Sequence, residues 1–203
     1  EFSAQCQSNL WDNISIKGRY SEPGFKLNSQ IKLNQLRPHA VIEYFSPGSG
    51  LKMTNAQANL ELDVETDGPD HLQATFQGAI PYMYWRRGKK DLKINDTRFQ
   101  GRFQFDDDTL MLDLLRLDLT EPRLRLAGRL NIDPRQSRIQ LELEGEQINV
   151  TTTQNIALAM TENDPTVSEI FTILRDGDFE RIAFKSQAPD WAQLAEEKNF
   201  VIQ

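Results

Sequence analysis

Apolar and polar residues alternate along most of the first 150 positions of the chain. In the segment LAGRLNIDPRQSRIQLELEG, residues 126–145, two alternating runs flank the turn DPRQ. A period of two is typical of a β-strand with one apolar face, and two such runs joined by a short turn indicate a β-hairpin. Further turns are predicted at TDGPD (66–70), RRGKK (86–90) and DDD (106–108), and a loop at SPGSG (46–50). The pattern predicts a meander of nine to twelve strands.

Four glycines lie inside predicted strands rather than in turns. They occur in the phrases KGRY, QGAI, QGRF and AGRL, as Gly18, Gly78, Gly101 and Gly128. A glycine within a strand marks a bulge, a sharp twist or a close approach of the backbone to another group. The similar phrases favour a repeated bend over four chance glycines.

The last third of the chain has a different pattern. A helix is predicted over 151–163, and a second over 165–175, where Pro165 opens an amphipathic run that ends at Gly177. A strand containing Phe179, Ile182 and Phe184 follows, then a short helix or turn at PDWAQLAEEK and a terminal strand from Asn199. We therefore expect one β-rich domain over 1–203, with a helical insert at 151–177. The expected fold is mainly β: an antiparallel, twisted and partly curled sheet, groove-like or sandwich-like, with one or two short helices in the C-terminal third.

Composition and charge narrow the possible partners. The formal net charge is -7, which argues against a nucleic-acid partner because phosphate binding requires a basic surface. The apolar fraction of 38% is low for a compact globule and suits a thin, extended sheet. No run of 18 apolar residues and no signal-peptide pattern is present. Because the chain opens without Met and stops within a predicted strand, we interpret it as a piece of a longer protein.

The sequence carries no recognisable catalytic, metal or cofactor motif. Cys6, His39 and His71 are isolated in sequence, and neither a zinc-ligand spacing nor a phosphate-binding glycine loop occurs. Asp106, Asp107 and Asp108 could attract a hard cation, although a solvated hairpin turn is the favoured interpretation. We therefore expect no enzymatic activity, no metal and no cofactor. A carbohydrate-acting β-enzyme stays open as an alternative, and it would require acidic and aromatic side chains converging in one cleft.

A basic turn beside aromatic residues is the most distinctive local feature. The residues considered for contact with a membrane or a lipid headgroup are Trp85, Arg86, Arg87, Lys89 and Lys90. Aromatic and basic side chains together are typical of membrane interfaces. Charged hairpin tips also occur simply because they discourage strand aggregation.

The apolar faces of the strands are the second candidate site. An open sheet must cover such a face with another layer, close on itself, or leave the face for a ligand. Packing in a sandwich, with helix 165–175 as a lid, is the ordinary outcome, and a groove that holds lipid acyl chains is the functional alternative. The predicted lining residues are Phe76, Ile80, Phe103, Phe105, Leu112, Leu114, Leu126 and Leu130.

The region from Leu141 to Gln203 resembles the C-terminal part of AsmA-like proteins, relatives of TamB. The resemblance rests on a strand pair that leads into a helical insert and on the phrase formed by Ile170, Phe171, Ile173, Arg175 and Gly177. It implies an envelope protein of Gram-negative bacteria, anchored in the inner membrane, whose periplasmic sheet handles phospholipids or assists outer-membrane assembly. It implies no residue-level roles, because the shared feature is an apolar lining.

Two functions are therefore expected. The first is non-enzymatic binding or transfer of lipid acyl chains in the periplasm. The alternative is a protein-interaction or structural module that pairs with an envelope protein through its strand edges.

Overall fold

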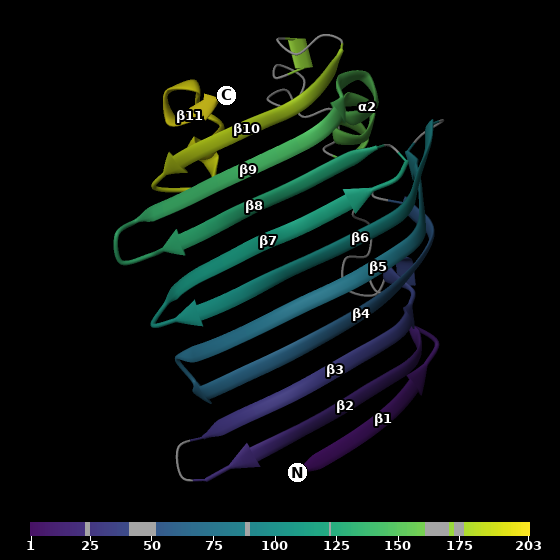
Figure 1. The fold of residues 1–203 in the computed structure, drawn as a ribbon, viewed down its shortest axis with the longest axis vertical. Helices are drawn as coiled ribbons and strands as arrows, with labels where there is room; N and C mark the ends of the chain where they lie inside the picture. The colour runs from purple at the N-terminus through teal and green to yellow at the C-terminus, as the bar shows by residue number, and fades with distance from the viewer. Residues whose placement is uncertain (23–24, 41–51, 88–89, 122, 161–170, 173–176) are drawn as a thin grey trace.

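The computed structural model describes residues 1–22, 25–40, 52–87, 90–121, 123–160, 171–172 and 177–203. Eleven strands form one antiparallel sheet in which every strand lies beside its neighbours in sequence (Figure 1). The predicted meander is confirmed. The strands are β1 (Phe2–Ser8), β2 (Trp11–Ser21), β3 (Lys26–Leu36), β4 (Lys52–Gly68), β5 (His71–Arg87), β6 (Lys90–Asp106), β7 (Thr109–Leu119), β8 (Leu124–Asp133), β9 (Arg138–Asn149), β10 (Asp178–Ala188) and β11 (Phe200–Ile202).

The predicted hairpin turns fall between these strands. Asp107 and Asp108 both have positive φ, 47° and 75°, which is the backbone of the two-residue turn that suits the right-handed twist of a hairpin. The TDGPD and DPRQ segments join β4 to β5 and β8 to β9. The SPGSG loop and the tip of the RRGKK turn lie outside the described residues.

The helix predicted at 151–163 is confirmed as α2 (Val150–Met160). Asn149 caps it: its side-chain Oδ1 accepts a hydrogen bond of 2.9 Å from the backbone N–H of Thr152, which would otherwise lack an intrahelical partner. The helix predicted at 165–175 lies almost wholly outside the described residues. Two short 3-10 helices, η1 (Ala192–Ala195) and η2 (Glu197–Asn199), occupy the predicted helix or turn before the terminal strand.

The sheet does not close on itself. In its strand order β1 and β11 are the two edges, and Figure 1 shows the strands as one twisted layer. The buried apolar cluster is small and lies at one corner, where Leu194 of η1 packs with Ile139 and Ala188. The buried Ser186 hydroxyl donates a hydrogen bond of 2.7 Å to the carbonyl oxygen of Leu194, which fixes η1 over that corner. Among the described residues, all strands belong to this sheet, so the structure contains no second sheet of a sandwich there.

The glycines inside strands mark close approaches. Phe99 lies over Gly78 and Phe76 over Gly101, and each aromatic residue is the direct cross-strand partner of its glycine. In the same way, Phe2 covers Gly18 and Leu143 covers Gly128. Gly101 also borders a register shift between β6 and β7, which bends the sheet there. Large side chains therefore lie along the sheet, over a neighbouring strand.

Candidate functional site: an open apolar face

The strand register places all eight predicted lining residues on one face of the sheet. Residues directly opposite each other in an antiparallel pair point to the same side. Phe76 pairs with Gly101, which pairs with Leu114, and Phe103 pairs with Leu112, which pairs with Leu130. Ile80, Phe105 and Leu126 follow by alternation within their strands. All eight side chains are partly exposed rather than fully buried.

Four rows of side chains run across this face from β3 to β9. One row consists of Ile31, Leu62, Phe76, Gly101, Leu114, Gly128 and Leu143. The next row consists of Ser29, Val64, Ala74, Phe103, Leu112, Leu130 and Leu141. Two flanking rows pass through Phe99 and Phe105. No described residue in these four rows is charged, and we refer to them together as the apolar face.

The apolar face is long compared with a lipid chain. The seven strands from β3 to β9 give six inter-strand steps of about 4.8 Å, so the apolar face extends roughly 29 Å across its strands. One leaflet of a bilayer has a hydrocarbon thickness of about 15 Å, half of the bilayer core. The apolar face is therefore longer than the hydrocarbon of one leaflet is thick, so an acyl chain could lie at more than one place along it.

The opposite face is charged and internally paired. Lys32 lies 2.5 Å from Glu61, Arg129 lies 2.6 Å from Asp113, and Arg125 contacts both Asp118 at 3.0 Å and Glu146 at 3.2 Å. Two hydrogen bonds lower the pKa of Glu61 below its ordinary value, and the one from Lys32 has a larger effect than the one from Gln77. Hydrogen bonds to carboxylates raise the pKa of Arg125, mainly through Asp118, and that of Arg129, through Asp113. The sheet is therefore amphipathic, with a solvated face and an apolar face.

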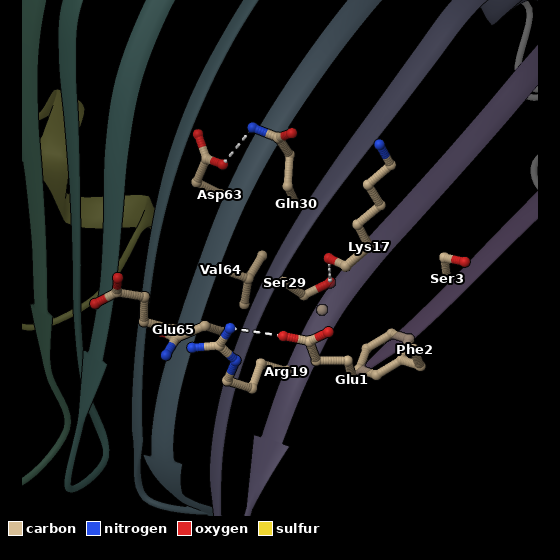
Figure 2. Close-up of a pocket in the computed structure, with 12 residues that line it drawn as sticks. Glu1, Phe2, Ser3, Lys17, Arg19, Ser29, Gln30, Asp63, Val64 and Glu65 are labelled. Carbon is tan, nitrogen blue, oxygen red and sulfur yellow. Dashed lines mark hydrogen bonds and ion pairs between the residues drawn. The ribbon is translucent and has the colours of Figure 1, made fainter.

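Two hollows on the charged face are lined by a mixture of charged, polar and apolar residues. The one in Figure 2 has a volume of about 650 Å³ and lies over β1 to β4, between Lys17, Arg19, Asp63 and Glu65. Its groups bind each other: Arg19 contacts Glu1 at 2.6 Å, and the Gln30 amide donates to Asp63 at 3.0 Å. A second hollow of about 440 Å³ lies over β3 to β7, where charged and polar residues stand beside Leu33, Leu60 and Phe99.

In the folded chain, His71 lies next to the acidic turn formed by Asp106, Asp107 and Asp108. His71 pairs with Asp106 across β5 and β6, and its Nδ1 lies 2.6 Å from an oxygen of Asp106. Together with Asp107 these groups could hold a cation, although all three are exposed. Arg135 lies 3.5 Å from Asp108 and brings positive charge to the same end of the sheet, which lowers its attraction for a cation. His71 is isolated in the sequence, and only the pairing of β5 with β6 brings it to Asp106.

The basic and aromatic residues of the β5–β6 hairpin are divided between the two faces. Strand alternation puts Trp85 on one side and its neighbours Tyr84 and Arg86 on the other. The Tyr84 ring lies 5.8 Å from that of Tyr82, and the Lys93 ammonium lies 5.7 Å from the centroid of the Tyr84 ring. Lys89 and the side chains of Arg87 and Lys90 lie outside the described part of the chain. The predicted headgroup contact is therefore only partly described.

Comparisons with protein-family models, with curated proteins and with solved structures found no match to this chain. The resemblance to AsmA-like proteins thus stays a prediction that rests on the residues quoted for it. Within the described residues, no helix has both the length and the apolar character needed to span a bilayer.

Proposed function

We propose that the apolar face binds acyl chains of lipids, without enzymatic catalysis. The observation that carries the proposal is an uncharged surface that continues across seven strands and keeps most of its side chains partly exposed. Ala74 and Ile139 are buried, and at the corner beneath Leu194 of η1 the predicted lining residue Leu130 packs against the same cluster as Ile139. Soluble proteins rarely leave apolar patches above a few hundred Å² open, and larger ones mark binding sites. Leu143, which is 39% exposed, lies at the end of a row that begins at Ile31 on β3.

Acyl chains suit this surface better than a polar ligand does. Their recognition requires contact with apolar side chains and few directed hydrogen bonds, and the four rows offer methyl, methylene and aromatic groups with only Ser29 and Thr66 as polar members. The glycines let large side chains of neighbouring strands lie flat on this surface, since Phe76 covers Gly101 and Leu143 covers Gly128.

The cellular setting is proposed from the resemblance alone. We propose that the chain belongs to a Gram-negative envelope protein that is anchored in the inner membrane, with this sheet in the periplasm. There it would carry phospholipid chains or assist outer-membrane assembly. The second candidate function is a protein-interaction or structural module that pairs with an envelope protein through its strand edges.

The test compares two glutamate substitutions at adjacent positions of β6. Phe103→Glu puts a charge on the apolar face, whereas Gln104→Glu puts the same charge on the solvated face. Binding is measured by fluorescence titration with a palmitate analogue that carries an environment-sensitive fluorophore. We expect Phe103→Glu to weaken binding at least tenfold, because a charged group would have to be desolvated against the chain. Gln104→Glu should bind as the unmodified protein does.

Folding is controlled separately. Phe103→Gln introduces no charge and should weaken binding less than Phe103→Glu, and urea unfolding identifies any variant that has lost its structure. Equal binding by folded Phe103→Glu and Gln104→Glu proteins would refute the proposed site. Absence of binding by the unmodified protein would favour the interaction module.

A further inference from the structure

The β4–β5 and β6–β7 hairpins turn at the same end of the sheet, where an imidazole meets two carboxylates. His71 begins β5 and Asp106 ends β6, and the two residues are direct cross-strand partners. Nδ1 of His71 lies 2.6 Å from Oδ1 of Asp106. Together with Asp107 they offer three possible ligand atoms, one from each side chain, that all lie within 4.8 Å of one another. We refer to these three residues as the His71 cluster.

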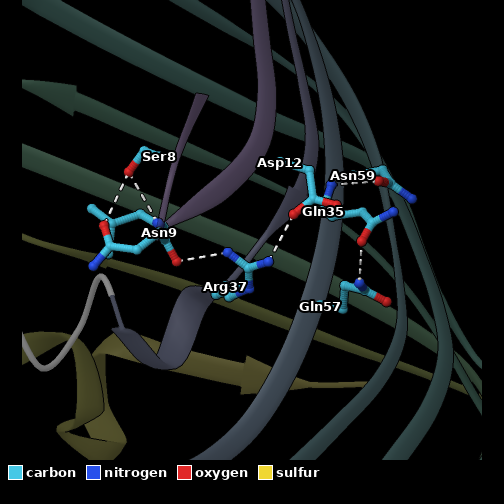
Figure 3. A network of polar contacts seen from close by, with 8 residues as sticks. Ser8, Asn9, Asp12, Gln35, Arg37, Gln57 and Asn59 are labelled. Carbon is cyan, nitrogen blue, oxygen red and sulfur yellow. Dashed lines mark hydrogen bonds and ion pairs between the residues drawn. The ribbon is translucent and has the colours of Figure 1, made fainter. Parts of the chain in front are cut away.

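The partner of Asp106 distinguishes this cluster from other acidic groups of the sheet. In the β1–β2 hairpin, for example, the carboxylate of Asp12 is bound by Arg37 at 2.7 Å (Figure 3). A guanidinium has only N–H donors, so it blocks a carboxylate without offering a lone pair to a metal ion. A neutral imidazole keeps one nitrogen lone pair and is the commonest metal ligand among side chains. The pairing with His71 therefore adds a nitrogen ligand beside the carboxylates.

Hydrogen bonds hold the two turns that carry the cluster. The backbone N–H of Asp107 donates to the carbonyl oxygen of Asp70 at 3.0 Å, which joins the β6–β7 turn to the β4–β5 turn. The hydroxyl of Thr66 donates to the carbonyl oxygen of His71 at 2.6 Å, which closes the β4–β5 turn. The backbones under the three side chains are thus fixed relative to each other, so that binding an ion has to order only the side chains.

We propose that the His71 cluster binds a zinc ion through one imidazole nitrogen of His71 and one carboxylate oxygen each of Asp106 and Asp107. Zn²⁺ takes such nitrogen and oxygen ligands at about 2.0–2.2 Å in a tetrahedral arrangement, which sets neighbouring ligand atoms about 3.3 Å apart. Reaching this arrangement separates His71 from Asp106 and draws Asp107 closer, each by no more than about 1.5 Å. The side chains are exposed and can rotate that far. Water takes the fourth position.

The ligand set selects zinc over a hard cation. Calcium takes about six to eight oxygen ligands, whereas an imidazole nitrogen suits zinc. Arg135 is the nearby positive charge, and it lies closer to Asp108, at 3.5 Å, than to Asp107, at 4.0 Å. Its charge therefore acts mainly on a carboxylate outside the cluster. A bound ion would bridge two adjacent hairpins at the end of the sheet.

The proposed zinc site is separate from the apolar face. His71 and Asp106 are the chain neighbours of Leu72 and Phe105, which pair with each other in a flanking row of that face. Successive residues of a strand point to opposite sides, so the His71 cluster lies on the solvated side. The inference goes beyond lipid binding and does not depend on it.

The test is isothermal titration of zinc chloride into the whole chain in a buffer that does not bind metals. We expect one ion per chain, and His71→Gln and Asp107→Asn should each weaken binding about 10–100-fold, as the loss of even a group that orients a ligand does. Asp108→Asn is the matched control, because it removes the same charge from the same turn but no proposed ligand. It should change the affinity less than about fivefold, the size of one exposed charge interaction. Calcium chloride should bind more weakly than zinc chloride.

Nuclear magnetic resonance of the unmodified protein identifies the ligand without any substitution. The chain has two histidines, His39 and His71, so zinc should shift the ring signals of His71 and leave those of His39 in place. Urea unfolding checks that each variant is folded. Absence of zinc binding by the unmodified protein would overturn the proposal, as would full affinity in folded His71→Gln. Equal weakening by Asp107→Asn and Asp108→Asn would also overturn it, since general negative charge would then explain the binding. None of these results bears on lipid binding.

Discussion

Replacing Gly101 with alanine tests whether large side chains lie along the sheet instead of projecting into a second layer. An added Cβ would come within 2.7 Å of both a ring carbon of Phe76 and the carbonyl oxygen of Asp113. The ring can move, whereas the backbone oxygen belongs to the paired strand β7 and cannot. Such overpacking costs about 1–3 kcal/mol, and the lower entropy of the unfolded alanine chain returns about 0.4–1 kcal/mol. We expect a net loss of about 1–2 kcal/mol.

Gly68 provides the matched control. A Cβ added at Gly68 would meet no atom within 4 Å, so Gly68→Ala should be neutral or slightly stabilising. The assay is urea unfolding followed by far-ultraviolet circular dichroism, with equal slopes required for the comparison. Phe76→Ala removes the ring and with it one of the two clashes of the added Cβ. Gly101→Ala should therefore lower the free energy of unfolding less in the Phe76→Ala protein than in the unmodified protein. If Gly101→Ala is as well tolerated as Gly68→Ala, the packing described for Phe76 is incorrect.

Two further predictions concern the charged face. Asp113→Asn should destabilise the fold by about 1–2 kcal/mol in urea unfolding, because the 11% exposed Asp113 side chain loses its charge-assisted bond to Arg129. Glu142→Gln, at a 56% exposed carboxylate that lies 3.7 Å from Lys185, should cost less than about 0.5 kcal/mol, and equal losses would contradict this reasoning. Glu61 has a folded-state pKa below its ordinary 4.5, so its stabilising contribution is present above pH 4.5 and disappears as the pH falls through the folded-state pKa. The stability difference between the unmodified protein and Glu61→Gln should accordingly shrink on acidification, and a difference that grows would refute the assignment.

The alternation of residues predicted the strands because a period of two depends only on local geometry. It also predicted which residues share a face within one strand, such as Phe103 and Phe105. That Phe76, Phe103 and Leu112 of three strands share a face follows from the register. The hairpin tips at Asp107 and Asp108 were predictable from turn chemistry, and the helix at 151–163 from its run of Ile156, Ala157 and Leu158.

Other features depend on long-range pairing and could not be read from the chain. Leu114 and Leu117 are three positions apart, yet both point to the apolar face, because a bulge in β7 adds Leu115, which is 48% exposed. The ring that covers each glycine comes from a neighbouring strand, and His71 meets Asp106 only through the register. Whether an apolar face is covered by a second layer is likewise a matter of tertiary packing. The sequence therefore left the choice between sandwich and groove open.

Native mass spectrometry of the gently purified protein, followed by extraction and identification of any bound lipid, tests the central claim most directly. The account predicts copurifying phospholipid or fatty acid, retained by Gln104→Glu and lost from folded Phe103→Glu. A lipid-free mass for the unmodified protein from an envelope-rich lysate, with no uptake when lipid is added back, would contradict it.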